Sequence, residues 1–553
     1  MNIVHSLPPI LDSSIPVAID TEWTGQVKER LHRPHGMFAC MSIAIDDDVY
    51  VIQDENDVPS ALWRIRNGLW IMQNAVYDIR QLRKITPIEP RYIWDTMLME
   101  KGLWGGYYSD FALDHMARRY LNVRLDKGVR ASFGNTQGQL TQEQIHYAAH
   151  DANITLKLYE CQHKIAHREE HMDVYNKVDM PMIWVILDMP PVRIDAERWI
   201  TMVQEFELRG KQIEEEIGVN VYSHQKVKDL IYQQTGLRLE DTQAETLEGL
   251  NFPVTEKILL TRMLRKATST YGEKWIEKNV EEYDLVYANF NIIGAATGRM
   301  SCSNPNLQQI PIRRIPEYRE LFIPQFDILL DTDVMAQEPH ILAWHSKDKE
   351  LKRIFEEGLD VHLEVARAAT GDMLMEKSDP RRSNIGKKLN LATSYGMSAL
   401  GLSRATGKTM AEAESFLAGY FRRFKGVKAY IDRQHSFAAS KGYVTTALGR
   451  RVWVNPHHQS ANNISINAPI QGGAADFTKR WAVLFHEACL HNKYRFPLTM
   501  MVHDELVCDV KYEEQENITG ILKQSFDKTA EELYPGLKFE AEILTGKNWK
   551  ECH

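Results

Sequence analysis

The feature that most constrains this chain is a pair of carboxylates placed inside an apolar run. The stretch LTMMVHDELVCDV (residues 498–510) begins and ends with apolar residues, and His503, Asp504 and Glu505 stand at its centre. Burying an unpaired carboxylate is costly, so the fold must treat these residues in one of two ways. Their side chains lie in a solvated turn between two strands, or they face a cation that the fold holds nearby. Taken alone, the stretch favours the turn.

Length and composition describe a globular protein with several folding units. The chain has 553 residues, more than one hydrophobic core supports, so we expect three or four units. A hydrophobic content of 44% and a charged content of 25% are ordinary for soluble proteins. No apolar run is long enough to span a bilayer, and the N-terminal MNIVHSLPPILDSSIP lacks the features of a signal peptide. The sequence therefore predicts a cytoplasmic protein without a membrane partner.

Cysteine usage and charge narrow the classes further. The six cysteines are scattered without a CxxC pair, which argues against a zinc site or a disulfide framework and suits a reducing compartment. The net charge of −9 argues weakly against a nucleic-acid partner. Basic clusters such as YFRRFKGVK (420–428) and LGRRVWVNP (448–456) lie mostly in the C-terminal half. They form either solvated helix faces or a channel for a polyanion.

The pattern along the chain predicts a multidomain α/β and α+β protein. Residues 1–165 alternate strand-like runs such as PVAIDTEW with helical patterns, which indicates an α/β unit. Residues 166–290 are almost all helix-like, with charged amphipathic stretches. A loop-rich segment follows near residue 290, and helices dominate again from 350 to 490.

Acidic residues recur at structured spacings in the N-terminal unit. In IDTEW (19–23), Asp20 and Glu22 are two residues apart on a strand, so both carboxylates point to the same face. In YAAHDANIT (147–155), Tyr147 and Asp151 share one face of a helix. Each pair alone is explained by a half-exposed helix or strand face.

A third piece completes the set. NAVYDIRQL (74–82) places Asn74 and Asp78 one helical turn apart. Four carboxylates, an Asn and a Tyr within one α/β unit suit a two-metal hydrolytic site, in which two ions about 3.5–4 Å apart activate a water and stabilise the leaving oxygen. Tyr147 is placed to position the attacking water.

Together with YIWDTMLMEKGL (92–103), these motifs resemble the DEDDy-type 3′→5′ proofreading exonucleases over roughly residues 15–165. The resemblance implies an RNase H-like domain over residues 1–165. It also implies an active site in which Tyr147 is catalytic and the metal ions are held by four carboxylates: Asp20, Glu22, Asp78 and Asp151.

The C-terminal half contains two further segments that could serve the central acids of the opening stretch. ILLDTDVMAQEPHILAW (328–344) reads as an apolar strand that ends in acids, Asp331 and Asp333, before a helix that begins near Glu338. RRSNIGKKLNLATSYG (381–396) reads as a helix with one face made of Lys387, Leu391, Ser394 and Tyr395. Alone, the first is a helix N-terminus decorated with acids, and the second is an amphipathic surface helix.

In this order, the three segments resemble motifs A, B and C of the DNA polymerase I-like (family A) DNA polymerases. AATGRMSCSNPNLQQIP (295–311), NAPIQGGAADFTKR (467–480) and GKNW (546–549) are similar to the same family, and the likeness covers roughly residues 15–550. It implies a right-hand polymerase domain after the exonuclease domain. The implied thumb is 166–290, the palm is 291–350 with 460–553, and the fingers are 351–459.

The resemblance also implies roles for single residues. Asp333 and Asp504 would hold two Mg²⁺ ions, with Mn²⁺ as a substitute, while the primer 3′-hydroxyl attacks the α-phosphate and pyrophosphate leaves. The implied nucleotide contacts are Lys387, Arg382, His362, Glu338, Leu391 and Tyr395, with Glu338 packed against Tyr395 as a gate against a ribose 2′-hydroxyl. The implied DNA contacts are Arg299, Asn306, Gln308, Arg451, Gln471 and His503. Glu505 is a neighbour of the site.

Three positions depart from the family pattern. Ser383 stands four residues before Lys387, where the family usually has an Arg, and Arg382 is one residue away. Leu391 replaces the usual aromatic residue, which changes how the incoming base and sugar are packed. His340 occupies the place in motif A where the family tends to have an Arg.

These observations predict a template-directed DNA polymerase with proofreading. Its expected partners are primer–template DNA, dNTPs and replisome proteins such as a helicase or single-strand binding protein. The chain begins at the exonuclease without a separate 5′-nuclease, which favours a replicative, phage-like enzyme acting in the host cytoplasm if viral. Two alternatives stand beside it: a 3′→5′ exonuclease with a DNA-binding but inactive polymerase scaffold, and a non-enzymatic protein that binds DNA or organises a replisome.

Overall fold

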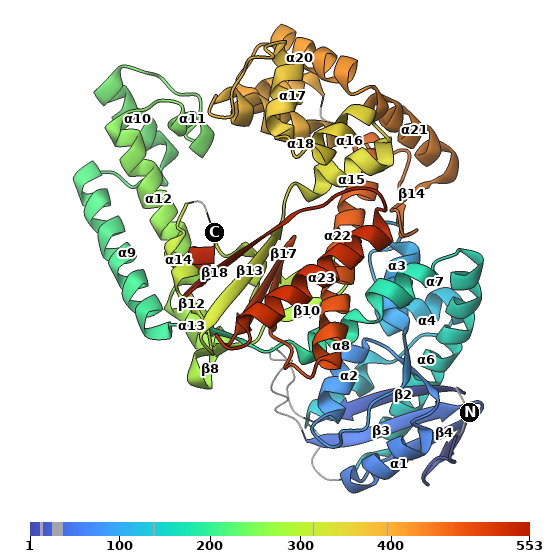
Figure 1. Ribbon diagram of the computed structural model, residues 1–553. Helices are drawn as coiled ribbons and strands as arrows, with labels where there is room; N and C mark the ends of the chain where they lie inside the picture. The colour runs from blue at the N-terminus through green and yellow to red at the C-terminus, as the bar shows by residue number, and fades with distance from the viewer. Residues whose placement is uncertain are drawn as a thin grey trace.

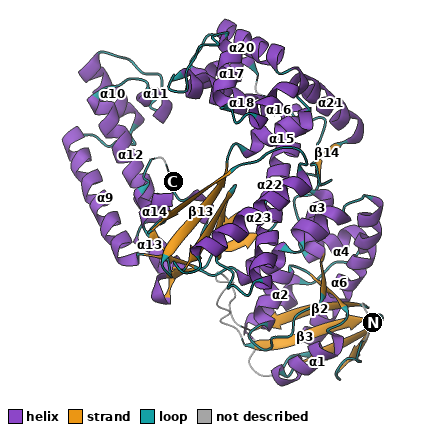
Figure 2. Cartoon of the chain, viewed as in Figure 1, coloured by secondary structure: helices purple, strands orange, loops and turns teal. Residues whose placement is uncertain are grey.

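The chain builds two sheet-centred bodies, and helical extensions rise from the second one (Figures 1 and 2). The computed structural model describes residues 1–11, 15–24, 37–135, 139–312, 314–394, 396 and 398–552. The N-terminal body holds a six-stranded sheet, and the C-terminal body holds a four-stranded sheet with long helices against it.

The N-terminal sheet is mixed, with the strand order β1-β4-β3-β2-β5-β6. β2 is antiparallel to β3 and parallel to β5, which places it at the centre. The strands are β1 (Asn2–Val4), β2 (Pro16–Trp23), β3 (Phe38–Ile45), β4 (Asp48–Ile52), β5 (Leu69–Met72) and β6 (Tyr92–Asp95). The surrounding helices include α1 (Val58–Ile65), α2 (Ala75–Leu82), α3 (Thr96–Trp104), α4 (Leu113–Leu121), α5 (Lys127–Ser132) and α6 (Gln142–Arg168). The predicted α/β, RNase H-like character of this part is confirmed.

A single buried carboxylate organises one edge of this body. Asp95, at the end of β6, accepts hydrogen bonds from the backbone N–H groups of Asn74 (3.3 Å) and Ala75 (2.7 Å), where α2 begins. It also accepts from Met97 (2.9 Å) and Leu98 (3.0 Å), where α3 begins. One side chain thus satisfies orphan donors of two helix N-termini, whose partial positive charges favour an anion.

A helical arm follows the N-terminal body. Its long helices are α9 (Ala196–Ile217) and α12 (Pro253–Tyr271), with α10 (His224–Thr235) and α11 (Ala244–Glu248) at the tip (Figure 1). At its base, Trp199 and Trp275 stack with ring centroids 4.5 Å apart. The base also contains three short strands that the helical pattern did not predict, β7 (Val192–Ile194), β8 (Val280–Glu281) and β9 (Leu285–Val286), and they form one sheet with β12 (Phe322–Ile323). Strands of two or three residues carry no periodicity, and β7 pairs with two strands that are distant from it in sequence, β9 and β12.

The C-terminal sheet is antiparallel, with the order β16-β17-β13-β18. Its strands are β13 (Ile328–Val334), β16 (Leu498–Val502), β17 (Glu505–Val510) and β18 (Ala541–Gly546). Two helices accompany it, α22 (Ala461–His491) and α23 (Gln515–Leu533), and the Trp481 indole N–H of α22 donates to the Leu522 carbonyl of α23 at 3.0 Å. β13 is an interior strand of this sheet because it pairs with β17 on one side and with β18 on the other.

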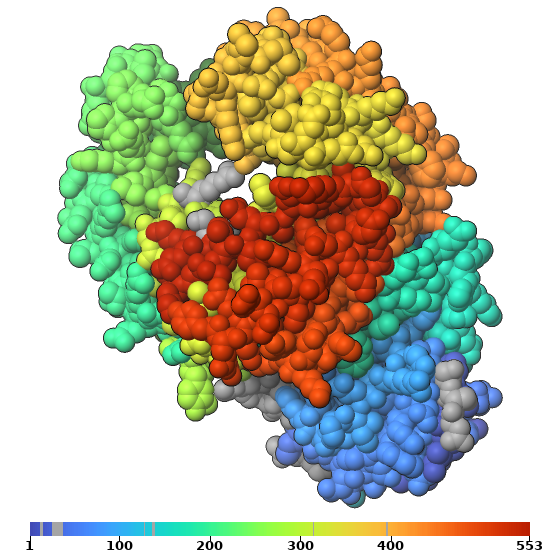
Figure 3. Space-filling view, viewed as in Figure 1, coloured from blue at the N-terminus to red at the C-terminus, as the bar shows by residue number. Residues whose placement is uncertain are grey.

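An upper lobe is formed by residues between β13 and α22. Its helices are α15 (Gln337–Ser346), α16 (Lys349–Glu356), α17 (Val361–Thr370), α18 (Lys388–Ser394), α19 (Ala399–Thr406), α20 (Met410–Arg423) and α21 (Lys425–Lys441). The hairpin β14 (Tyr443–Thr445) and β15 (Arg451–Trp453) leads back to α22. Figure 3 shows a cleft bounded by this lobe, the arm and the C-terminal body.

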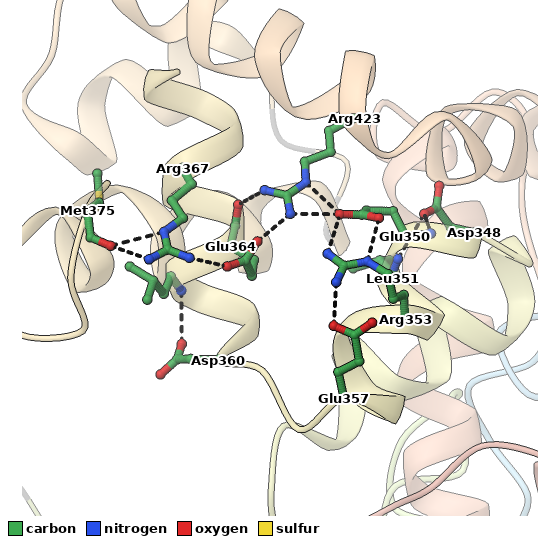
Figure 4. A network of polar contacts seen from close by, with 11 residues as sticks. Asp348, Glu350, Leu351, Arg353, Glu357, Asp360, Glu364, Arg367, Met375 and Arg423 are labelled. Carbon is green, nitrogen blue, oxygen red and sulfur yellow. Dashed lines mark hydrogen bonds and ion pairs between the residues drawn. The ribbon is translucent and has the colours of Figure 1, made fainter. Parts of the chain in front are cut away.

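Ion pairs tie the helices of the upper lobe together (Figure 4). Glu350 of α16 accepts from Arg353 at 2.9 Å and from Arg423 of α20 at 3.0 Å. Glu364 of α17 pairs with Arg423 and, at 2.7 Å, with Arg367. The bonds from Arg353 and Arg423 lower the pKa of Glu350 to about 2. Arg423 therefore links helices within the lobe. For this residue, both predictions for the basic cluster 420–428, a solvated helix face and the wall of a channel, are wrong.

The remaining sequence-based expectations concern cysteines and membranes. All six cysteines are free, and five of them are buried. Within the part of the chain that the structure describes, no helix combines the length and the apolarity needed to cross a bilayer.

Replacing Asp95 tests its double capping role. We expect Asp95→Ala to lower the free energy of unfolding of the N-terminal body by on the order of 2–4 kcal/mol, because two helix caps are lost in a buried setting. Urea unfolding measures the loss. Asp54→Ala is the matched control, because Asp54 caps only a short exposed turn through Asn56. Equal losses in the two variants would contradict the role of Asp95.

Candidate active sites

Three predicted carboxylates of the N-terminal body lie together. Asp20 and Glu22 point from the same face of β2 toward Asp151 on α6, and one oxygen of each lies within 4.8 Å of the others. The Tyr147 hydroxyl bonds to the carboxylate of Asp151 one turn later on the helix. Among the described residues, Asp151 Oδ1 is buried without a hydrogen-bond donor. This oxygen is available for a cation.

Asp78 adjoins this cluster but is held by a different partner. Its Oδ1 accepts a hydrogen bond of 2.5 Å from the Thr21 hydroxyl, which itself accepts from the Trp23 indole at 3.0 Å. Asp78 still acts on the cluster. The pKa of Asp20 is raised mainly by burial, next by the charge of Glu22 and then by the charge of Asp78. Thr21, on the alternate face of β2, carried no sequence signal because it has no charge.

Asn74 is not part of the cluster. It is the residue before α2 and adopts a left-handed conformation, with φ of 64°. It lines a separate small cavity together with Arg80 and Asn291. The helical-turn spacing from Asp78 therefore misplaced it, because the helix begins only at Ala75.

A cation that the sequence did not reveal faces the acids. The charge of Arg130, on α5, lowers the pKa of Glu22 and Asp151 and so opposes the effect of burial. The acidic charges of the cluster in turn raise the pKa of Arg130. Arg130 lies in a segment without a recognisable motif, and only the packing of α5 beside α6 brings it there.

Burial and mutual repulsion disfavour the ionised acids of this cluster. Burial raises the pKa of Glu22 to about 8, and the charge of Asp151 adds to it. Burial raises the pKa of Asp78 to about 7 and that of Asp151 to about 6. Like charges gathered out of water require a positive partner before all of them ionise.

The second site forms where a hairpin meets the central strand of the C-terminal sheet. β16 and β17 are joined by the two residues His503 and Asp504, and His503 has a positive φ of 58°. β17 pairs with β13 so that Glu505 stands opposite Asp333. The stretch 498–510 is thus a hairpin whose tip lies beside a distant acid, as the first of the two alternatives expected, and the cation of the second stays a prediction.

Further acids surround this pair. Glu542 on β18 stands opposite Asp333 on the other side of β13, and no sequence motif pointed to it. Burial raises the pKa of Asp333 to about 6, and the charges of Asp504 and Glu542 contribute. Burial also raises the pKa of Asp504 and brings that of Glu505 to about 8. Arg319 opposes this charge, with Nη1 3.9 Å from Glu505 Oε2.

A cavity of about 640 Å³ opens over these acids. Nine of the predicted residues line it: Asp333, Asp504, Lys387, His362, Glu338, Leu391, Arg299, Gln308 and His503. Lys387 and Leu391 both reach it, which confirms that they share a face. Arg299 Nη2 lies 2.6 Å from Glu338 Oε1, so the cavity lining contains an ion pair.

Other predicted site residues lie outside the cavity lining. Arg382 pairs with Asp360 at 2.6 Å, and the Asn306 side chain accepts from the Gln308 N–H at 3.1 Å. Gln471 lies on α22. Arg451 pairs with Glu169 and stands over the ring of Tyr443, so the fold directs it toward the N-terminal body. Tyr395 lies outside the described residues. Its predicted packing against Glu338 therefore stays a prediction.

His340, which departs from the family pattern, is a core residue. Its ring stacks on Phe355, with centroids 3.7 Å apart, and on Phe539 at 4.8 Å. Burial lowers its pKa to about 4, so it is neutral. It does not replace the charge of an arginine at the cavity.

Comparison with protein families decides the relationship of this chain. The family model described as DNA polymerase family A matches residues 197–551. The chain belongs to DNA polymerase family A. A second model, described as 3'-5' exonuclease, matches residues 7–164 of this family A chain.

Curated relatives of this family A chain are bacterial DNA polymerases I. That of Pseudomonas aeruginosa is 31% identical over 533 residues, which cover 88% of this chain and 57% of that protein. That of Chloroflexus aurantiacus is 31% identical over 441 residues, which cover 73% of this chain and 46% of that protein. The chain thus spans about half the length of these relatives.

A solved structure shares the fold. The Pol domain of Pol1 from M. smegmatis, in complex with DNA primer–template and dNTP, matches with a TM-score of 0.83 and 22% identity. The match covers 98% of this chain and 96% of that one, so the arrangement of both bodies is common to the two proteins.

The raised pKa values of the N-terminal cluster predict a pH dependence of stability. Without metal, Glu22, Asp78 and Asp151 hold their protons more tightly in the folded chain, with pKa values of about 8, 7 and 6. The folded state binds more protons than the unfolded state between about pH 4 and pH 8, so the free energy of unfolding falls as the pH rises through this window.

Thermal unfolding in a chelator measures this effect. We expect the melting temperature of Asp20→Asn with Glu22→Gln to exceed that of the wild type by several degrees at pH 8, and by less at pH 5. The comparison of variant with wild type cancels the titration of groups elsewhere. A difference that is constant with pH would contradict the repulsion assigned to the cluster.

Proposed function

We propose that this chain is a template-directed DNA polymerase with a separate 3′→5′ exonuclease site, acting in the replication of DNA. The observation that carries the proposal is the single cavity that Asp333, Asp504 and Lys387 line together. A second acidic cluster lies in a different body, at Asp20 and Glu22. Polymerisation and excision would thus use different acids of one chain.

The proposed domains follow the boundaries expected from the sequence. The exonuclease domain would be residues 1–165, and the helical arm would be the thumb, 166–290. The C-terminal sheet and its helices would be the palm, 291–350 and 460–553. The upper lobe would be the fingers, 351–459. The matched segments, 7–164 and 197–551, support the division between the two activities.

The carboxylates suit divalent metal ions at both sites. Hard oxygen ligands are what Mg²⁺ prefers, and Mn²⁺ is a substitute. The buried oxygen of Asp151 without a donor, and the acids around Asp333, are best explained by such ions. Asp20, Glu22, Asp78 and Asp151 would hold them in the exonuclease, and Asp333 and Asp504 in the polymerase. Bound ions would offset the charge that develops on the phosphate oxygens.

The polymerase cavity offers a place for each part of the reaction. The primer 3′-hydroxyl would attack the α-phosphorus of a dNTP, and pyrophosphate would leave. Lys387 would contact the triphosphate from one wall, with His362 beside it. Glu338 would stand near the sugar, where a ribose 2′-hydroxyl would meet its carboxylate.

Primer–template DNA would contact three further residues of the cavity lining. They are Arg299, Gln308 and His503, and Asn306 and Gln471 would extend the contact. Arg382 would have to exchange Asp360 for a phosphate to reach the nucleotide. Arg451 would have to leave Glu169 to reach DNA. Contacts with a helicase or a single-strand binding protein stay predictions.

The exonuclease site would release the 3′-terminal nucleotide by attack of water. Tyr147, whose hydroxyl bonds to Asp151, would orient that water. Burial and the neighbouring charge of Asp151 raise the pKa of Tyr147, so its hydroxyl keeps its proton. Arg130 stands near enough to stabilise a phosphate that approaches the cluster.

Paired variants separate the two activities. We expect Asp333→Ala or Asp504→Ala to abolish primer extension with dNTPs and Mg²⁺ and to leave degradation of a 3′-labelled single strand unchanged. Asp20→Ala with Glu22→Ala should do the reverse, because the two clusters lie in different bodies. One gel with labelled primer measures both.

The same gel discriminates the alternatives. A wild-type chain that degrades but never extends would be an exonuclease with a polymerase-like scaffold. A chain that does neither would be a DNA-binding protein without catalysis. Near-wild-type extension by Asp333→Ala would show that the metal-binding acids are elsewhere.

Because residue 391 is a leucine, we expect the polymerase to incorporate dideoxynucleotides poorly. Its side chain is 40% exposed and lines the cavity, but it offers no hydrogen bond to replace one lost with the 3′-hydroxyl. A hydrogen bond to a charged group is worth roughly 1.5–3 kcal/mol, so Leu391→Tyr should raise relative ddNTP incorporation about tenfold or more.

The measurement is the ddNTP/dNTP incorporation ratio in the Asp20→Ala, Glu22→Ala background, which prevents excision from masking selection. Leu391→Phe is the matched control, because it has the ring without the hydroxyl. Wild-type ratios in both variants would mean that residue 391 does not face the sugar.

A further inference from the structure

Four charged side chains form a buried cluster between the two bodies. Arg450 binds Asp179 with both terminal nitrogens at 2.8 Å, and its Nε lies 2.7 Å from Asp476 Oδ1. Lys479 Nζ donates to Asp179 Oδ1 at 2.7 Å. All four side chains are at most 2% exposed. Two cations and two anions balance one another, which makes such burial tolerable.

Asp179 comes from a segment outside both matched families. It ends the helical turn η3 (Tyr175–Asp179), between the segments 7–164 and 197–551. Its partners belong to the polymerase part: Lys479 and Asp476 to α22, and Arg450 to the hairpin before it. The two cations hold the pKa of Asp179 far below its usual range, against the effect of burial, so it is ionised.

Arg450 presses directly on the turn that carries Arg299. Gly298 has a φ of 87°, and a Cβ on it would lie 2.5 Å from Arg450 Nε. Behind the turn, a Cβ on Gly472 of α22 would lie 2.9 Å from the Thr297 carbonyl oxygen. Only glycine permits these approaches, so the turn is clamped between the guanidinium and the helix.

Lys479 supports the same segment from its other end. Its Nζ also lies 3.5 Å from the Ile292 carbonyl oxygen, and its side chain contributes to the cavity wall. The turn closes on itself through the Arg299 carbonyl, which accepts from Gly294 at 2.9 Å and Ala295 at 3.1 Å. Arg299 then meets Glu338 at 2.6 Å inside the cavity.

We propose that Asp179 is a positioning residue of the polymerase site, which holds Arg450 and Lys479 so that Arg299 and Glu338 keep their places beside the incoming sugar. This inference rests on the proposed function. Asp179 touches no substrate. Without its charge, two cations would compete for Asp476, the guanidinium would leave Gly298, and the Arg299–Glu338 pair would lose its fixed position.

The test is the selection between ribonucleotides and deoxyribonucleotides. We expect Asp179→Asn to raise the rNTP/dNTP incorporation ratio by about three- to tenfold, the scale on which residues of one network couple. Single-strand degradation should not change, because the exonuclease acids lie elsewhere. The matched control is Asp173→Asn, whose carboxylate is 74% exposed and pairs with Lys177 at 3.5 Å. It should keep the wild-type ratio.

A changed ratio must be separated from a loss of stability. The ratio is therefore measured at a temperature where circular dichroism shows that the variant is folded. A wild-type ratio in folded Asp179→Asn would overturn the proposal. If that variant does not fold, Arg450→Lys replaces it, because it keeps the charge and loses the two-pronged bond. A wild-type ratio there overturns the proposal equally. A wild-type chain that extends no primer would instead refute the proposed function.

Discussion

Repulsion between carboxylates out of water is the constraint on which both candidate sites depend. Burial raises the pKa of Glu22 and of Glu505 to about 8, so ionising all the acids of either cluster costs free energy. The fold maintains them through strands and helices that are stabilised elsewhere. A site that stores repulsion in this way is prepared for a cation, and it gains stability when one binds.

The same balance of charge explains how the two bodies are joined. The cluster around Asp179 is buried, like the carboxylates of the two candidate sites. It is neutral overall, because the positive charges of Arg450 and Lys479 compensate the negative charges of Asp179 and Asp476. Compensated charges can serve as a rigid connection, since breaking one partner leaves another stranded. A cluster of carboxylates whose charges are not balanced in this way favours the binding of a cation.

Charge also distinguishes the lobe from the cavity it faces. In the upper lobe, arginines such as Arg423 are consumed by glutamates within the lobe, and Arg382 is paired with Asp360. Lys387 lines the cavity itself. The ion pairs therefore stabilise the packing of the lobe, and Lys387 contributes a positive charge to the cavity. Position, rather than the number of basic residues, separates an arginine that is paired within the lobe from a lysine that lines the cavity.

The sequence by itself was enough to predict which residues form the two acidic clusters and in which order they occur along the chain. Strand and helix periods were enough to place Asp20 and Glu22 on one face, and motif spacing was enough to nominate Asp333 and Asp504. Local periodicity reports which way a side chain points, and it does so within one element. Only the tertiary structure decided which elements meet. It brought Glu542 beside Asp333 through strand pairing, and it turned Arg451 away from the cleft, because contacts between residues hundreds of positions apart leave no trace in a local pattern.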